Sequence, residues 1–182
     1  LAFTSLAAVL AVRGVWGGPW FMDVKGLTRI EAGNALIPLT LAVAIGPLVA
    51  GALDRLTGAR RALLAGSHLA AAGLLLVVVA AAPLGRESAH GVLGSASFDA
   101  WVFFVFGCCM STQPLLFAMG QSATARESAG KALAALNLMF FCGTAFHQLA
   151  SGAIASAFGV APVFVYFAVF LAVSALLFLR CT

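Results

Sequence analysis

The chain of 182 residues is strongly apolar, with 63% hydrophobic and only 9% charged residues. Its mean hydropathy of +1.08 and its long apolar runs predict an integral membrane protein. The formal charge of +4 does not indicate nucleic-acid binding, because the basic residues are spread over short polar breaks and form no patch. The four cysteines have no C-x-x-C spacing, so they predict neither a metal site nor a redox motif.

Polar breaks divide the chain into apolar segments that are long enough to cross a bilayer as helices. We number them span 1 to span 6, and they cover roughly residues 1–23, 31–54, 61–83, 98–121, 128–156 and 160–180. The predicted fold class is therefore an all-α membrane protein with six transmembrane helices in one unit, residues 1–182.

Span 1 contains the stretch RGVWGGPW, residues 13–20. If the span ends near residue 23, Arg13 lies about 15 Å inside it, near the bilayer midplane, where a charge normally faces a cavity or a partner. Helical spacing puts Trp16, Gly17 and Trp20 on the same face as Arg13. We expect Arg13, Trp16 and Trp20 to line a cavity and contact a solute. Alternatively, Arg13 snorkels or pairs with a carbonyl group, and the tryptophans belong to an interfacial belt.

A charge cluster follows span 2 in the stretch LDRLTGARR, residues 53–61. An acidic residue beside three basic ones at a membrane rim can form ion pairs that hold or release neighbouring helices. The same charges could instead only fix topology as stop-transfer signals. We predict that this loop has a gating role, carried by Asp54, Arg55, Gly58, Arg60 and Arg61.

Span 4 is interrupted by Pro114, which follows Gln113. A proline inside a helix removes one backbone hydrogen bond and kinks the helix, and membranes tolerate this where neighbours or a cavity satisfy the freed carbonyl. We therefore expect Gln113 to contact a solute.

Span 5 carries a polar stripe, because Asn137, Thr144, Gln148 and Ser151 lie within about 60° of one another on a helical wheel. His147 lies at the flank of this stripe. Asn137, His147 and Gln148 are candidate solute contacts, although hydrogen bonding between helices is the commoner use of such residues.

The basic residues indicate the orientation in the membrane, because positively charged loops are preferentially cytoplasmic. One side has six of them and the other has three: Arg55, Arg60, Arg61, Arg126, Lys131 and Arg180 against Lys25, Arg29 and Arg86. Both ends of the segment are therefore predicted to be cytoplasmic, and a bacterial inner membrane is the expected location.

The types of residue found in the spans recur with a period of three spans. Spans 1 and 4 are aromatic and contain proline, and spans 3 and 6 are nearly featureless. Spans 2 and 5 carry small residues, Gly46 and Ala50 or Gly143 and Ser151, which allow close helix approach. This pattern predicts a 3+3 inverted-repeat bundle.

The loop of residues 50–61 resembles the cytoplasmic motif of the major facilitator superfamily, a small residue followed by Asp-Arg, a glycine and a basic pair. Ala50 replaces the usual glycine, and one residue is inserted before Gly58. The stretch WGGPW and Asn137 to Phe140, with Gln148 and Gly152, also resemble the carboxyl-terminal half of bacterial members. The resemblance implies helices seven to twelve of a twelve-helix transporter, whose amino-terminal half is missing here.

The predicted function is secondary active transport of a small solute, which could be anionic, by alternating access. The expected partners are this solute, the lipid bilayer and the amino-terminal half, with no cofactor, metal or nucleic acid. No acidic residue lies in the middle of a span, so proton coupling would depend on His147 or on the missing half. A six-helix half-transporter or scaffold that acts as a dimer is the alternative. An enzyme is not expected, because the chain has no Gly-x-Ser-Gly turn and no zinc-ligand spacing.

Overall fold

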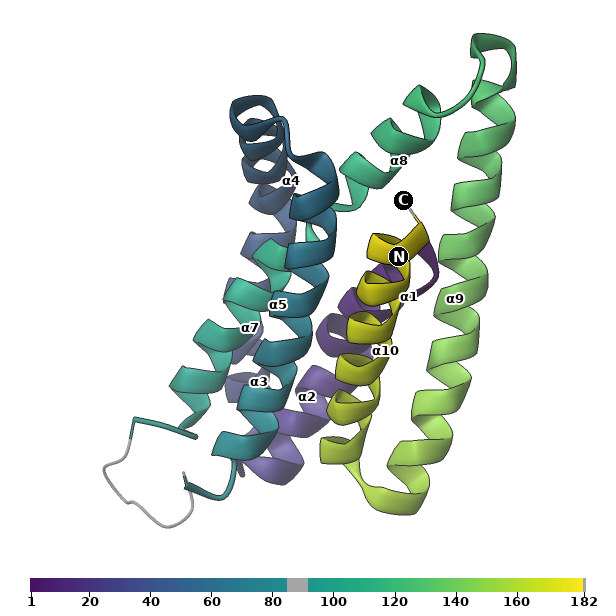
Figure 1. Ribbon diagram of the computed structural model, residues 1–182. Helices are drawn as coiled ribbons and strands as arrows, with labels where there is room; N and C mark the ends of the chain where they lie inside the picture. Colours follow the sequence, from purple (N-terminus) through teal and green to yellow (C-terminus); the bar gives the residue numbers. More distant parts are fainter. Residues whose placement is uncertain (85–91, 182) are drawn as a thin grey trace.

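The computed structural model describes residues 1–84 and 92–181 as a bundle of long helices, and this part of the chain contains no strand (Figure 1). Five helical segments within it are long and apolar enough to cross a membrane. They are Arg29–Thr57, Arg60–Ala81, Ala96–Ser122, Arg126–Phe158 and Val160–Cys181. The chain thus has an all-α fold of the multi-pass membrane type, as the sequence predicts.

Span 1 is also helical but irregular. It consists of α1 (Ala2–Leu10), the π-helical η1 (Ala11–Trp16), the short α2 (Gly17–Pro19) and the π-helical η2 (Trp20–Val24). A π-helix is wider than an α-helix and bonds residues five apart, as the amide of Lys25 does with the carbonyl of Trp20 at 3.3 Å. A Cβ atom at Gly17 would overlap the Val12 carbonyl oxygen, so this turn requires glycine.

The other predicted spans agree with the observed helices to within a few residues. Span 2 is α3 (Arg29–Ala35) followed by α4 (Ile37–Thr57), and span 3 is α5 (Arg60–Ala81). Span 4 is α7 (Ala96–Met110) followed by α8 (Gln113–Ser122). Span 5 is the single 3₁₀ turn η3 (Arg126–Ser128) with α9 (Ala129–Phe158), and span 6 is α10 (Val160–Cys181).

The main packing partners are distant in sequence. Helix α1 packs mainly on α9, α4 on α7, and α5 on α10. Two glycines permit the closest approaches, since an added Cβ would overlap Ser111, which follows α7, at Gly46 and the backbone of Phe3 at Gly143. The predicted close approach of spans 2 and 5 to their neighbours is confirmed at these two positions.

The bundle has two ends that differ in charge. At one, which we call the basic end, α4 meets α5, α8 meets α9, and the first and last described residues lie nearby (Figure 1). At the other, which we call the Asp99 end, span 1 meets α3 and α9 meets α10. Arg86, which contributes to the predicted orientation, lies outside the described residues. The largest buried side chains gather toward the Asp99 end: Trp20, Phe21, Phe103, Phe106, Phe164 and Phe167.

Candidate functional site

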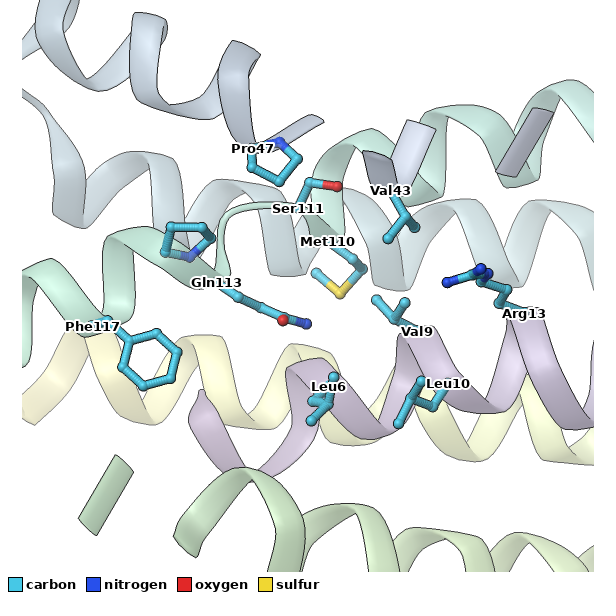
Figure 2. A pocket seen from close by; sticks show the side chains of 11 residues that line it. Leu6, Val9, Leu10, Arg13, Val43, Pro47, Met110, Ser111, Gln113 and Phe117 are labelled. Carbon is cyan, nitrogen blue, oxygen red and sulfur yellow. The ribbon is translucent and has the colours of Figure 1, made fainter. Parts of the chain in front are cut away.

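A cavity of about 420 Å³ lies between span 1, α4 and span 4 (Figure 2). Its wall is mainly apolar, and three polar side chains interrupt it, those of Arg13, Ser111 and Gln113. The remaining lining residues are Leu6, Val9, Leu10, Val43, Pro47, Met110, Pro114 and Phe117. A largely apolar pocket with a few polar groups is the usual form of a small-molecule site.

Arg13 supplies the positive charge of this cavity. It lies in η1, its side chain is exposed, and it makes no hydrogen bond or ion pair with any residue in 1–84 or 92–181. A guanidinium group presents five donors in a planar fork that matches carboxylate or phosphate oxygens. The cavity therefore has an anion-binding group without an internal counter-charge in the described part of the chain.

Gln113 approaches the same cavity from the break between α7 and α8 (Figure 2). The break begins at Ser111, whose hydroxyl donates to the Gly107 carbonyl at 2.6 Å. Pro114 has no N–H, so the helix cannot form its usual backbone bond to the Met110 carbonyl. Gln113 is the first residue of α8 and is only partly buried, which leaves its amide available to a ligand. The structure thus brings together Arg13 and Gln113 from different spans.

The two tryptophans of span 1 do not line this cavity. Trp16 is half-buried and donates its Nε1–H to Ser151 Oγ of α9 at 3.0 Å. Trp20 is fully buried and donates its Nε1–H to Asp99 Oδ2 at 2.7 Å. The expected grouping of Arg13, Trp16 and Trp20 around one cavity is therefore not observed at this cavity; the expectation assumes the α-helical period, whereas parts of span 1 are π-helical.

The three candidates on α9 also lie outside the cavity. Asn137 and Gln148 are exposed, and neither side chain has a hydrogen-bond partner among the described residues. His147 is buried, with Nδ1 2.7 Å from the Tyr166 hydroxyl and the Phe170 ring 5.0 Å away between centroids. The three candidates are therefore divided between an exposed face of α9 and the packed interior.

The loop between α4 and α5 brings its charges together locally. Arg60 donates from Nε and Nη2 to Asp54 Oδ2, at 3.0 and 2.5 Å. Gly58 ends α4 with a φ of 62°, a left-handed conformation that favours glycine. Arg61 donates to the Leu179 carbonyl near the end of α10, while Arg55 is exposed. The loop therefore connects α4, α5 and α10 at the basic end.

A second buried polar cluster was missed by the sequence reasoning. Asp99 Oδ2 accepts from Trp20 and lies 2.9 Å from Lys25 Nζ, and Lys25 also donates to the Gly94 carbonyl at 2.7 Å. The sequence predicts that Lys25 and Asp99 lie on the same side of the membrane, but only as charges of the polar breaks between spans. Ser95 is the usable signal, because as an N-cap residue it predicts that Asp99 lies inside the first turn of the following helix.

No group of three or more His, Cys, Asp or Glu residues that could hold a metal ion occurs within 1–84 and 92–181. The chemistry available at the cavity is instead a cation and an amide facing an apolar chamber. Comparison of the chain with family models, curated proteins and solved structures finds no match.

Proposed function

We propose that this chain forms one half of a secondary transporter of the major facilitator type, and that its cavity binds a small anionic or carbonyl-bearing solute. The observation that carries the proposal is the Arg13 guanidinium, which has no partner within residues 1–84 and 92–181 and shares a cavity with Gln113. Insertion of arginine at the centre of a membrane helix costs about 2.5–3.5 kcal/mol on translocon scales. A ligand that needs the charge explains why the residue is present.

The packing pattern supports an inverted repeat. Exchange of span 1 with 4, 2 with 5, and 3 with 6 converts the α1–α9 contact into the α4–α7 contact, and leaves the α5–α10 contact unchanged. The same exchange relates the glycine of span 2 that approaches span 4 to the glycine of span 5 that approaches span 1. Two three-helix units related in this way are typical of transporters that alternate access around a central site.

The missing amino-terminal half would cover the exposed polar residues of α9 and complete the solute site. Asn137 and Gln148 would then face the cavity between the two halves. The excess of basic residues at the basic end supports a cytoplasmic location for both ends of this segment. In this arrangement the Asp54 loop would gate access from the cytoplasmic side.

The test is solute binding to the protein expressed from its full reading frame. A panel of carboxylates, phosphates and neutral carbonyl compounds is screened by thermal shift, and hits are measured by equilibrium binding. We expect Arg13→Gln to abolish solute binding. Arg13→Lys should lower the affinity for anions that bind through two oxygens, because lysine keeps the charge but lacks the planar fork. Arg126→Gln, which removes an exposed arginine outside the cavity, is the matched control.

Unchanged binding by folded Arg13→Gln protein would assign the arginine a structural role and contradict the proposal. Uptake measurements distinguish the two-half transporter from the alternative, a half-transporter that acts as a dimer. Saturable uptake by residues 1–182 alone, reconstituted in vesicles, would indicate a half-transporter that works as a dimer. Uptake that requires an upstream six-span half would support the two-half transporter.

A further inference from the structure

The cavity that contains Arg13 is elongated, and its charge lies at one end. Leu6, Leu10 and Arg13 line it from span 1, and the seven residues from Leu6 to Arg13 correspond to about 10 Å along a helix. On span 4, Phe117 lies about one helical turn beyond Gln113. Figure 2 shows Arg13 at one end, Phe117 at the other and Gln113 between them.

The end of the cavity at Phe117 is apolar and well supported. The Phe117 ring is half-buried, and its centroid lies 5.2 Å from that of the Phe140 ring on α9. Phe140 is itself buried. Leu6 and Met110 line the cavity between its two ends (Figure 2). A ligand that fills this part of the cavity transfers apolar surface out of water, which is favourable.

Few lining side chains can donate a hydrogen bond to an anion. Carboxylate oxygens only accept hydrogen bonds, so they need N–H or O–H donors. The Arg13 guanidinium offers five such donors and the Gln113 amide offers two. The Ser111 hydroxyl has one proton, and it is donated to the Gly107 carbonyl at 2.6 Å. The lining of this half therefore provides donors for one anionic group, at Arg13 and Gln113.

The same lining is unfavourable for solutes with more polar groups. A second charge would lie against apolar side chains, where burial of an unpaired charge is strongly unfavourable. A sugar would bury several hydroxyl groups without partners, at a penalty for each. An ammonium group beside the anionic group would approach Arg13, and no acidic residue is among the described residues that line the cavity. A single anionic group on an apolar body fits this wall best.

We propose that the solute is an amphipathic monocarboxylate, whose carboxylate binds Arg13 and Gln113 and whose apolar body extends toward Phe117. This inference rests on the proposed transport function and names the substrate class of its cavity. Leu6 and Phe117 both lie on the side of the basic end relative to Arg13 and Gln113. The bound solute therefore has its apolar body directed toward the basic end.

Binding of a homologous series to the full-length protein in lipid nanodiscs tests this proposal. Acetate, butyrate, hexanoate and octanoate each compete with radiolabelled octanoate, and nanodiscs without protein correct for partition into lipid. Each CH₂ group that enters the apolar end should raise the affinity about fourfold, until the cavity is filled. Equal affinities along the series would overturn the proposal.

Two further compounds test the number and sign of the charges. Suberate replaces the terminal methyl group of octanoate by a second carboxylate, which would lie at the apolar end. 2-Aminooctanoate adds an ammonium group beside the carboxylate. We expect each compound to bind at least about tenfold more weakly than octanoate. Tighter binding of suberate or of 2-aminooctanoate would assign a dianion or a zwitterion as the solute and overturn the proposal.

Variants at the two ends of the cavity should affect the series differently. Arg13→Gln should abolish binding of every carboxylate. Phe117→Ala should lower the affinity for octanoate about tenfold and leave that for acetate within about twofold, because only the long chain reaches the ring. Leu6→Ala is a second variant of the apolar wall and should act in the same direction. Phe158→Ala, which removes a ring that is 75% exposed at the Asp99 end of α9, is the matched control and should keep all affinities.

The results distinguish an error in the substrate class from an error in the function. Binding of acetate or inorganic phosphate that depends on Arg13, without any gain from chain length, would overturn the amphipathic class and leave transport of a small anion as proposed. Absence of Arg13-dependent binding for every anion tested would contradict the proposed function, and this inference with it. Binding that rises with chain length and is lost in Arg13→Gln would support both.

Discussion

The two ends of the bundle each contain an ion pair, and the pairs differ in almost every physical respect. Asp54 and Arg60 are six residues apart, lie in the last turn of α4 and at the start of α5, and are 11% and 34% exposed. Asp99 and Lys25 join different spans and are 0% and 7% exposed. Exposed ion pairs contribute little to the free energy of unfolding, whereas removal of one partner of a buried pair is strongly destabilising. The first pair fixes the local geometry of one turn, and the second joins two segments that are distant in sequence.

The largest expected effect follows from removal of one charge of the buried pair. We expect Asp99→Asn to lower the free energy of unfolding by about 3–5 kcal/mol, because Lys25 is left buried without a counter-charge. Unfolding in mixed micelles measures the change. The Lys25→Met/Asp99→Asn double variant should recover much of the loss. An equal loss in both variants would mean that the pair is not coupled as described.

A smaller loss is expected from Trp20→Phe, which removes one donor from the Asp99 carboxylate and keeps an aromatic ring. A hydrogen bond to a charged group contributes about 1.5–3 kcal/mol, against about 0.5–1.5 kcal/mol for a neutral one. Trp16→Phe is the matched variant, because it breaks the neutral bond to Ser151 in the same span. Trp20→Phe should therefore lower the free energy of unfolding more than Trp16→Phe does. The reverse order would contradict the special status of the buried carboxylate.

At the basic end, the loop depends on backbone conformation at Gly58. Gly58→Ala places a Cβ on a residue with a φ of 62°, at an expected loss of about 1–2 kcal/mol in the free energy of unfolding. Gly51→Ala, in the adjoining helix and with no other atom within 4 Å of the added Cβ, is the control and should be neutral or stabilising. If the two variants behave alike, the left-handed turn is not what shapes this loop.

The smallest effect on stability is expected from Asp54→Asn. The pair with Arg60 is partly exposed, so we expect a change below about 1 kcal/mol in the free energy of unfolding. The variant should nevertheless slow transport while equilibrium solute binding stays within a few-fold, because the loop is remote from the cavity. Uptake rates and binding constants measured side by side test this expectation. A large loss of affinity with a normal exchange rate would place the loop at the solute site.

The same contrast explains which features could be predicted from the sequence. Span positions follow from apolar length, and Asp54 and Arg60 are only six residues apart, so both features depend on local information. The close approaches at Gly46 and Gly143 follow from residue size. The shared location of Arg13 and Gln113 could be anticipated only as two separate candidates at similar depth.

The pairing in the buried cluster could not be predicted, because the Ser95 N-cap places Asp99 in a helix but nothing in the sequence selects Asp99 over Asp23 or Glu31 as the partner of Lys25. The choice is made by packing of spans that are distant in sequence. The π-helical turns of span 1 could not be predicted either, since a residue pattern read with the α-helical period carries no signal of a wider turn. Within these turns, Arg13 lines the cavity, whereas Trp20 lies in the core.

The pairing of α1 with α9, α4 with α7 and α5 with α10 also constrains how the bundle is assembled. Helices α1 and α5 enter the membrane before the helices that cover most of their buried faces have been synthesised. Contacts between distant segments form slowly, because closing long loops is entropically unfavourable. Until α9 arrives, Gly143 cannot pack against Phe3 and Trp16 lacks its acceptor Ser151. The nascent chain must therefore keep span 1, with the charged Arg13, stable in the membrane until span 5 has been synthesised.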